Sequence, residues 1–169
     1  LSGLRGERIS FQIAFCGEEQ EYNKAEVPVK ADSALPVSLY LVGNVPCELP
    51  AYADAHDDDY LTINPGLFPD PLFPLGDTVD AVKALWRAIW VEVSIPEDVA
   101  AGDYPVAVTI GDSETQLIIS VIDAKLPVQE FCFTQWMHYD CIAQAHHVPI
   151  FSEAHWELIR KYVRMAVAH

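Results

Sequence analysis

The segment RISFQIAF, residues 8–15, alternates without a break between apolar side chains and polar or small ones. Successive side chains of a β-strand point to opposite faces, so the apolar members of this segment share one face. These members are Ile9, Phe11, Ile13 and Phe15. The pattern predicts a half-buried strand and favours a mainly β fold.

Further strands are predicted downstream by the same two-residue period, at residues 37–41, 89–95 and 106–110, and by an apolar run at residues 117–122. Gly111–Glu114 has the composition of a tight hairpin turn between the last two strands. Short strands with turn residues between them predict an antiparallel β-sandwich over residues 6–122. We expect its core to contain Ile9, Phe11, Ile13, Val91, Val93, Val106 and Val108.

Residues 46–85 interrupt this pattern. They contain an acidic patch at Asp54 and Asp57–Asp59 and several apolar residues between Leu67 and Leu75. After Pro46 they also contain five prolines, which are Pro50, Pro65, Pro69, Pro71 and Pro74. The composition predicts one long loop that packs onto another surface, and long loops inside compact domains are usually functional.

The pattern changes after Ile122. Asp123–Gln129 predicts a short connector, Phe131–Trp136 one more strand, and Ser152 the N-cap of a helix that continues to about Ala168. Its expected core stripe is Trp156, Ile159, Val163 and Ala166. Strand, loop and helix form the repeating unit of a (β/α)8 barrel, which needs about 250 residues when complete.

We therefore predict two domains, an accessory β-sandwich at residues 1–124 and the first strand, loop and helix of a truncated barrel at residues 125–169. The rest of the barrel is then an expected partner.

Composition restricts the possible partners. The formal net charge is −15, from 25 acidic and 10 basic residues, and such a surface repels nucleic acid and anionic lipid but not neutral sugars. No apolar run reaches the roughly 18 residues of a membrane span, and the first residues, LSGLRGERIS, do not have the pattern of a signal peptide. The lack of a signal-peptide pattern, together with cysteines that are expected to be free, favours a cytoplasmic location.

The sequence shows no metal or cofactor motif. The cysteines, which form no CxxC pair and are expected as free thiols, are Cys16, Cys47, Cys132 and Cys141. A Cys132–Cys141 disulfide is the less favoured alternative. The spacing of Cys132 and Cys141 and of His138, His146 and His147 matches no zinc signature. The acidic patch lacks the glycine and glutamate of a calcium loop. We expect no metal and no cofactor.

A family resemblance lies mainly in Thr134–His169, which is TQWMHYDCIAQAHHVPIFSEAHWELIRKYVRMAVAH. This segment resembles the start of the catalytic barrel in a bacterial glycoside-hydrolase-like family whose barrel is called a domain of unknown function. It is similar, more distantly, to glycoside hydrolase family 123, the β-N-acetylgalactosaminidases, which also place a β-sandwich before the barrel. GERISFQIAF and IPEDVAAGDYPVAVTI, residues 6–15 and 95–110, resemble that sandwich. Met137 departs from the family, where an aromatic residue is expected.

Trp136, His138 and Asp140 are the candidate substrate-binding residues. They follow the predicted barrel strand, and loops at the carboxyl ends of barrel strands build the active site. An indole face stacks on a sugar ring, while imidazole and carboxylate groups hydrogen-bond its hydroxyls. Two other interpretations stay open. In one, Trp136 is core and His138 satisfies a buried carbonyl; in the other, a purely structural module buries all three residues without connecting them.

No catalytic residue is predicted. Glycoside hydrolysis needs a carboxylic acid and a second carboxylate or a substrate acetamido group. The resemblance implies an adjacent Asp–Glu pair on a later barrel strand, and no such dipeptide follows the predicted strand here.

The leading hypothesis is an inactive amino-terminal fragment of a glycoside hydrolase whose substrates are carbohydrates, such as N-acetylhexosaminides. The alternative is a stand-alone carbohydrate-binding or adhesion β-sandwich. Trp86 and Trp90 would then form a sugar platform instead of a seam against the barrel.

Overall fold

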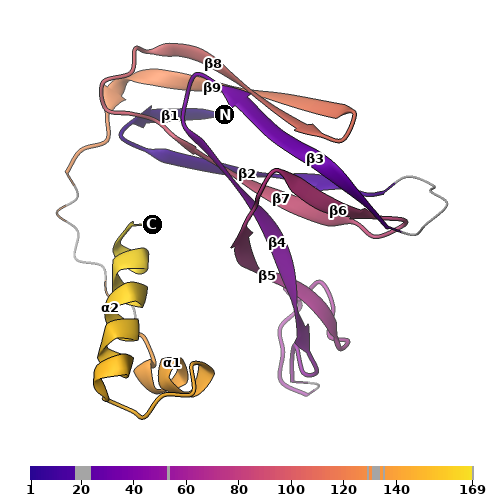
Figure 1. Ribbon diagram of the computed structural model, residues 1–169, viewed down its shortest axis with the longest axis vertical. Coiled ribbons are helices and arrows are strands. Elements are labelled where there is room, and N and C mark those ends of the chain that lie inside the picture. The colour runs from indigo at the N-terminus through magenta and orange to yellow at the C-terminus, as the bar shows by residue number, and fades with distance from the viewer. Residues whose placement is uncertain (18–23, 53, 129, 131–133, 135, 169) are drawn as a thin grey trace. The chain divides into compact units, whose positions relative to one another are not determined.

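The computed structural model describes residues 1–17, 24–52, 54–128, 130, 134 and 136–168. These residues form two compact units, Leu1–Pro127 and Val128–His169, which are described separately below. The first unit contains β1 (Ser2–Arg5), β2 (Arg8–Phe15), β3 (Lys24–Ser33), β4 (Val37–Cys47), β5 (Gly66–Pro74), β6 (Thr78–Val82), β7 (Arg87–Ser94), β8 (Gly102–Ile110) and β9 (Ser113–Lys125) (Figure 1).

The strands of the first unit form two sheets, so the fold is mainly β as predicted. The five-stranded sheet has the order β1-β9-β8-β3-β6, and the four-stranded sheet has the order β2-β7-β4-β5. Among the pairs in the described residues, β1 and β9 run parallel and the others antiparallel. β1 lies outside residues 6–122, the range over which an antiparallel arrangement was predicted. The chain runs along β9 first and then enters the other sheet through a turn at Gly6, whose φ is 86°.

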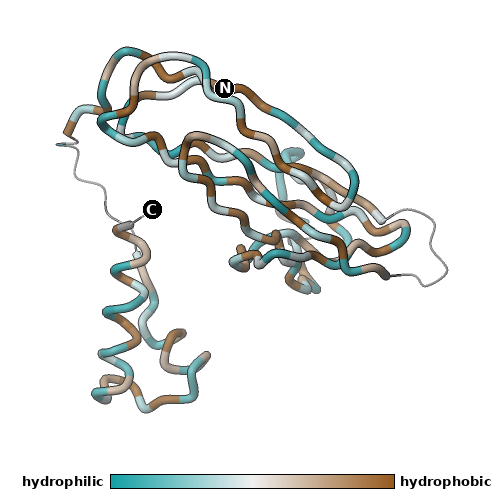
Figure 2. The backbone as a smooth tube through the Cα atoms, turned by 45° about the horizontal axis from the view of Figure 1, so that its top comes forward, coloured by the Kyte–Doolittle hydropathy of each residue, from teal (hydrophilic) through white to brown (hydrophobic). Residues whose placement is uncertain are grey.

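The buried core collects apolar side chains from both sheets, and Figure 2 shows hydrophobic and hydrophilic residues alternating along the strands. Four of the predicted core residues, Val91, Val93, Val106 and Val108, are fully buried, whereas Ile9, Phe11 and Ile13 are half-buried and pack against the core. The predicted faces are thus correct. β2 keeps partial exposure because it is the edge strand of its sheet and has a neighbour on one side only.

The prediction of one long loop at residues 46–85 is wrong in part. β4 extends to Cys47 and pairs with β5, while β6 pairs with the first half of β3. β5 contains Pro69, Pro71 and Pro74, and a strand can hold prolines where it forms the edge of a sheet because the missing N–H groups then need no partner. Glu48–Pro65, apart from residue 53, contains no strand.

The second unit contains two helices, α1 (Tyr139–Ala145) and α2 (Glu153–Ala168). The predicted strand Phe131–Trp136 falls mostly outside the described residues, and its described members, Thr134 and Trp136, have no regular secondary structure. The helix after Ser152 is confirmed, but α1 was expected to be loop. None of the helices in the described part of the chain is long and apolar enough to span a membrane.

The predicted core stripe of α2 is correct only at Ile159. Trp156, Val163 and Ala166 are exposed, and the buried positions are His155 and Ile159, with Leu158 and Tyr162 half-buried. The buried face of α2 is therefore not the predicted one. It is the face that carries His155, whose ring is hydrogen-bonded, and that packs against α1.

Candidate functional site

Trp136, His138 and Asp140 lie at the amino-terminal end of α1. Trp136 precedes the helix, His138 is its N-cap residue in an extended conformation (φ −87°, ψ 98°), and Asp140 lies in its first turn. All three side chains are exposed, Trp136 to 94%. Within the described residues they make no hydrogen bond to one another. Burial of these side chains, as in the two other interpretations, does not occur within the described part of the chain.

The carboxyl end of α1 has the hydrogen bonds of a Schellman motif. His147 has a positive φ of 53°, its N–H donates to the carbonyl of Gln144 (3.2 Å), and the N–H of Val148 donates to the carbonyl of Ala143 (3.0 Å). This motif usually places glycine where His147 stands. The motif reverses the chain and leads it toward α2.

The start of α2 is stabilised by a cap and by aromatic packing. The N–H of His155 donates to the hydroxyl oxygen of Ser152 (3.2 Å), which confirms the predicted N-cap. The ring of Phe151 stacks on that of Trp156 with a centroid distance of 5.7 Å, in the positions of a hydrophobic staple. This staple explains why Trp156 points away from the buried face of the helix.

His155 is fully buried, and both of its ring nitrogens are hydrogen-bonded. Nδ1 accepts from the N–H of Phe151 (2.8 Å), and Nε2 lies 2.8 Å from the carbonyl oxygen of Tyr139. The first bond requires an acceptor and the second a donor, so the assigned tautomer carries its proton on Nε2. The ring thereby connects α2 to the first residue of α1.

Sequence reasoning missed His155. The available signal was its place three residues after the N-cap Ser152, where a glutamate or glutamine that reaches back completes a capping box. A histidine there also reaches back, but to the N–H of Phe151.

His146 contacts Tyr162 of α2. Nε2 of His146 lies 2.9 Å from the hydroxyl oxygen of Tyr162, and the two rings meet edge to face. Among the described residues no three His, Cys, Asp or Glu side chains are grouped so that they could hold a metal ion. Cys16, Cys47 and Cys141 are free thiols. The alternative Cys132–Cys141 disulfide lies outside the described residues because Cys132 is not among them.

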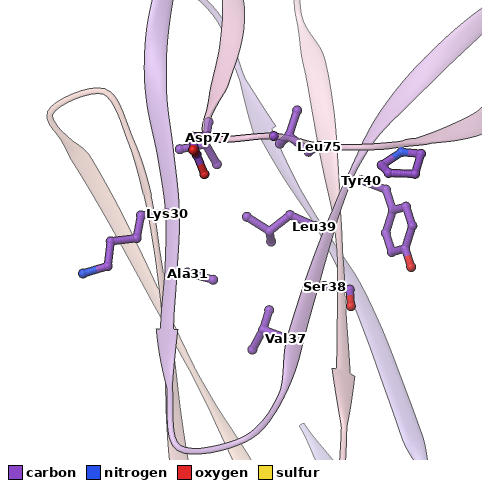
Figure 3. A pocket seen from close by; sticks show the side chains of 11 residues that line it. Lys30, Ala31, Val37, Ser38, Leu39, Tyr40, Leu75 and Asp77 are labelled. Carbon is purple, nitrogen blue, oxygen red and sulfur yellow. The ribbon is translucent and has the colours of Figure 1, made fainter.

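In the first unit, a groove of about 540 Å³ lies between β3, β4 and the residues that connect β5 to β6 (Figure 3). Val37, Leu39 and Ala31 point into this space, while Lys30 points away from it. Asp77 is the only carboxylate that lines it. The described residues that line the groove therefore contain no pair of carboxylates.

Trp86 and Trp90, the proposed sugar platform or seam, differ in position. Trp86 precedes β7 and is 70% exposed, whereas Trp90 lies within β7 and is half-buried. The strand register places Gln12 and Tyr40 on either side of Trp90.

The comparisons with known proteins concern both units. The family model of the glycoside hydrolase 123 catalytic domain matches residues 136–169, the segment that begins at Trp136 and contains α1 and α2. The chain is distantly similar to glycoside hydrolase family 123.

A family 123 glycoside hydrolase from Clostridium perfringens, studied for glycolipid glycan hydrolysis, has a similar structure, with a TM-score of 0.66 and 14% sequence identity. The match covers 97% of this chain and 30% of that enzyme, so the chain spans less than a third of the enzyme's length. At this identity the likeness shows the fold. The sporulation control protein Spo0M from Bacillus subtilis matches with a TM-score of 0.37 and 12% identity, over 71% of this chain and 44% of that one. No curated protein matches the chain.

Proposed function

We propose that this chain is the amino-terminal part of a glycoside hydrolase. In this proposal residues 1–124 form the accessory β-sandwich, and residues 125–169 form the first strand, loop and helix of a (β/α)8 barrel. The observation that carries the proposal is the match of a glycoside hydrolase catalytic-domain model to residues 136–169, within a compact unit that begins at Val128. The motifs TQWMHYDC and FSEAHW favour the bacterial family whose barrel is called a domain of unknown function as the closer relative.

The exposed surface of α2 supports a barrel that continues beyond this unit. Trp156, Val163, Met165 and Val167 are exposed, although a helix in a finished domain normally covers its large apolar side chains. We propose that further barrel elements cover these side chains. The same elements are proposed to supply the catalytic acid.

Trp136, His138 and Asp140 are the proposed contacts to the sugar. No hydrogen bond or ion pair within the described residues occupies their side chains, so an indole face, an imidazole and a carboxylate are available to a ligand. An uncharged polyol suits this set because it offers an apolar ring face and many hydroxyls. The proposed substrate is an N-acetylhexosaminide, in keeping with the family resemblance.

The test uses the protein in which the remainder of the barrel follows this chain. Aryl N-acetylhexosaminides report turnover directly, and the expected result is hydrolysis by that protein that Trp136→Ala reduces. Absence of both turnover and binding over a panel of α- and β-linked N-acetylhexosaminides would contradict the proposal.

A carbohydrate-binding module is the second candidate, and the neighbourhood of Trp90 favours it. Tyr40 and Gln12 flank Trp90 across the sheet, which places a second aromatic ring and an amide next to the indole. In that case the 169-residue chain itself binds oligosaccharides, and Trp90→Ala weakens the binding while Trp136→Ala does not. Titration calorimetry of both variants separates the two candidates.

A further inference from the structure

The further inference concerns His155, the one fully buried polar side chain among the described residues. We propose that His155 is a positioning residue, which holds the main chain at Tyr139 and thereby orients the sugar-binding segment Trp136–Asp140. The inference rests on the proposed function, because it assigns His155 a role in that same site.

The bond from Nε2 of His155 to the Tyr139 carbonyl is not needed to form α2. The cap of α2 uses the main-chain N–H of His155 and the hydroxyl of Ser152, and the Phe151 bond uses Nδ1. The Nε2 bond leaves the start of α2 and reaches a residue 16 positions earlier in the sequence, with a length of 2.8 Å. That residue stands between His138 and Asp140.

The packing of α1 shows why its first turn needs such an anchor. The buried residues of this seven-residue helix are Ile142 and Ala143, in its second half. Tyr139, Asp140 and Cys141, in the first turn, are exposed. Apolar packing therefore holds the middle of α1, and the hydrogen bond of His155 links α2 to its first turn.

The presence of an imidazole at a buried position also indicates that the segments around it must be held in a defined orientation. An apolar side chain of similar volume would fill the space without the cost of removing polar atoms from water, and each hydrogen bond returns only about 0.5–1.5 kcal/mol. Two hydrogen bonds with defined directions fix the relative position of three segments, the Phe151 turn, α2 and the first turn of α1.

Two substitutions separate the bonds of His155. Asparagine places its polar atoms near the position of Nδ1, so His155→Asn keeps an acceptor near Phe151 and loses the reach to Tyr139. Glutamine places its amide near the position of Nε2, so His155→Gln keeps a donor to the Tyr139 carbonyl. His146→Asn is the matched control, because it removes the other polar link between the helices, to Tyr162, at the far end of α1.

The experiment measures kcat and KM for an aryl N-acetylhexosaminide in the full-length protein, together with hydrogen exchange of residues 138–146. We expect His155→Asn to raise KM roughly tenfold and to accelerate exchange in the first turn of α1, because misplaced binding groups lose much of their effect. His155→Gln should stay within about threefold of the wild-type KM, and His146→Asn should lower the melting temperature without changing KM.

Equal KM values in His155→Asn and His155→Gln, with unchanged exchange at residues 138–141, would overturn the inference and leave His155 a core residue only. A failure of the proposed function gives a different result. His155→Asn then accelerates exchange as expected, but Trp136→Ala and Asp140→Asn leave KM and kcat at their wild-type values, which removes the sugar subsite that the anchor was inferred to serve.

Discussion

Asp140 and His138 each combine a local structural role with the proposed ligand contact. The carboxylate of Asp140 lies in the first turn of α1, near the positive end of the helix dipole, where an acidic group contributes about 0.3–1 kcal/mol. His138 caps the same helix through its backbone conformation only, because its side chain makes no capping hydrogen bond. Its imidazole can therefore be changed with little effect on α1.

Removal of these two side chains tests the subsite. In the full-length protein, His138→Ala and Asp140→Asn should each lower kcat/KM roughly tenfold or more, which equals at least about 1.4 kcal/mol of transition-state binding. The melting temperature should change little because both residues are exposed. Kinetics and thermal unfolding of the same preparations provide the check. Near wild-type kcat/KM in both variants, or activity lost only in step with folded protein, would contradict the subsite.

The elements of the second unit depend on caps as much as on packing. α1 ends in a Schellman motif with His147 in the glycine position, and α2 begins with the Ser152 cap and the Phe151–Trp156 stack. Few apolar side chains of this unit are buried, so each cap is a large share of what holds the helices.

Loss of the Ser152 cap should destabilise α2. We expect Ser152→Ala to cost about 1 kcal/mol, since the N–H of His155 loses its acceptor. Ser152→Asp is the control, because its carboxylate caps the same N–H group. Hydrogen exchange within α2 measures the difference, and equal protection in both variants would show that the cap contributes nothing.

In the first unit, a central and an edge strand should differ in their response to the same change. Ile89 on β7 is fully buried, and its cross-strand partner Ile13 on the edge strand β2 is half-buried. Ile89→Ala should cost about 3 kcal/mol, within the range of about 2–5 kcal/mol for buried isoleucine, and Ile13→Ala clearly less. Urea unfolding of the 169-residue chain gives both values; a larger cost at Ile13 would mean that the core is centred elsewhere.

The sequence predicted an element correctly where the local residue pattern alone determines its structure. Strict alternation of apolar and polar residues identified β2 and the buried faces of β7 and β8, because this two-residue period is typical of a half-buried strand. β5 was missed because prolines normally exclude strands, and only its place at the sheet edge, which no local pattern reveals, permits them. The buried face of α2 was missed because a hydrogen-bonded His155, not the apolar stripe, determines it.

At the scale of the whole molecule, the chain offers one candidate subsite, and the sequence predicts no catalytic residue in it. Asp140 is an exposed carboxylate at the proposed site, and the acidic residues of α2, Glu153 and Glu157, belong to a helix that in a barrel would lie outside the strands. The exposure of Trp136 agrees with its predicted place in a sugar subsite, although indoles are usually well buried.

The 169-residue chain should accordingly show no glycosidase activity. We expect no turnover of aryl N-acetylhexosaminides above the buffer rate, because the sequence predicts no acid and stabilising pair in this chain. Continuous release of nitrophenol is a sufficient assay, with the full-length protein as the positive control. Turnover abolished by a substitution within this chain would refute the expectation.

The parallel pair of β1 and β9 affects how the protein is made. The main-chain nitrogen of Leu1 donates to the carbonyl of Ile118 (3.0 Å), and Arg5 forms an ion pair with Asp123 (2.8 Å). During synthesis at about 5–20 residues per second, β1 therefore waits on the order of ten seconds before its partner strand leaves the ribosome. β1 can pair only after β9 has been made, so a nascent chain exposes an open β edge until then, and that interval is when a chaperone would have most to protect.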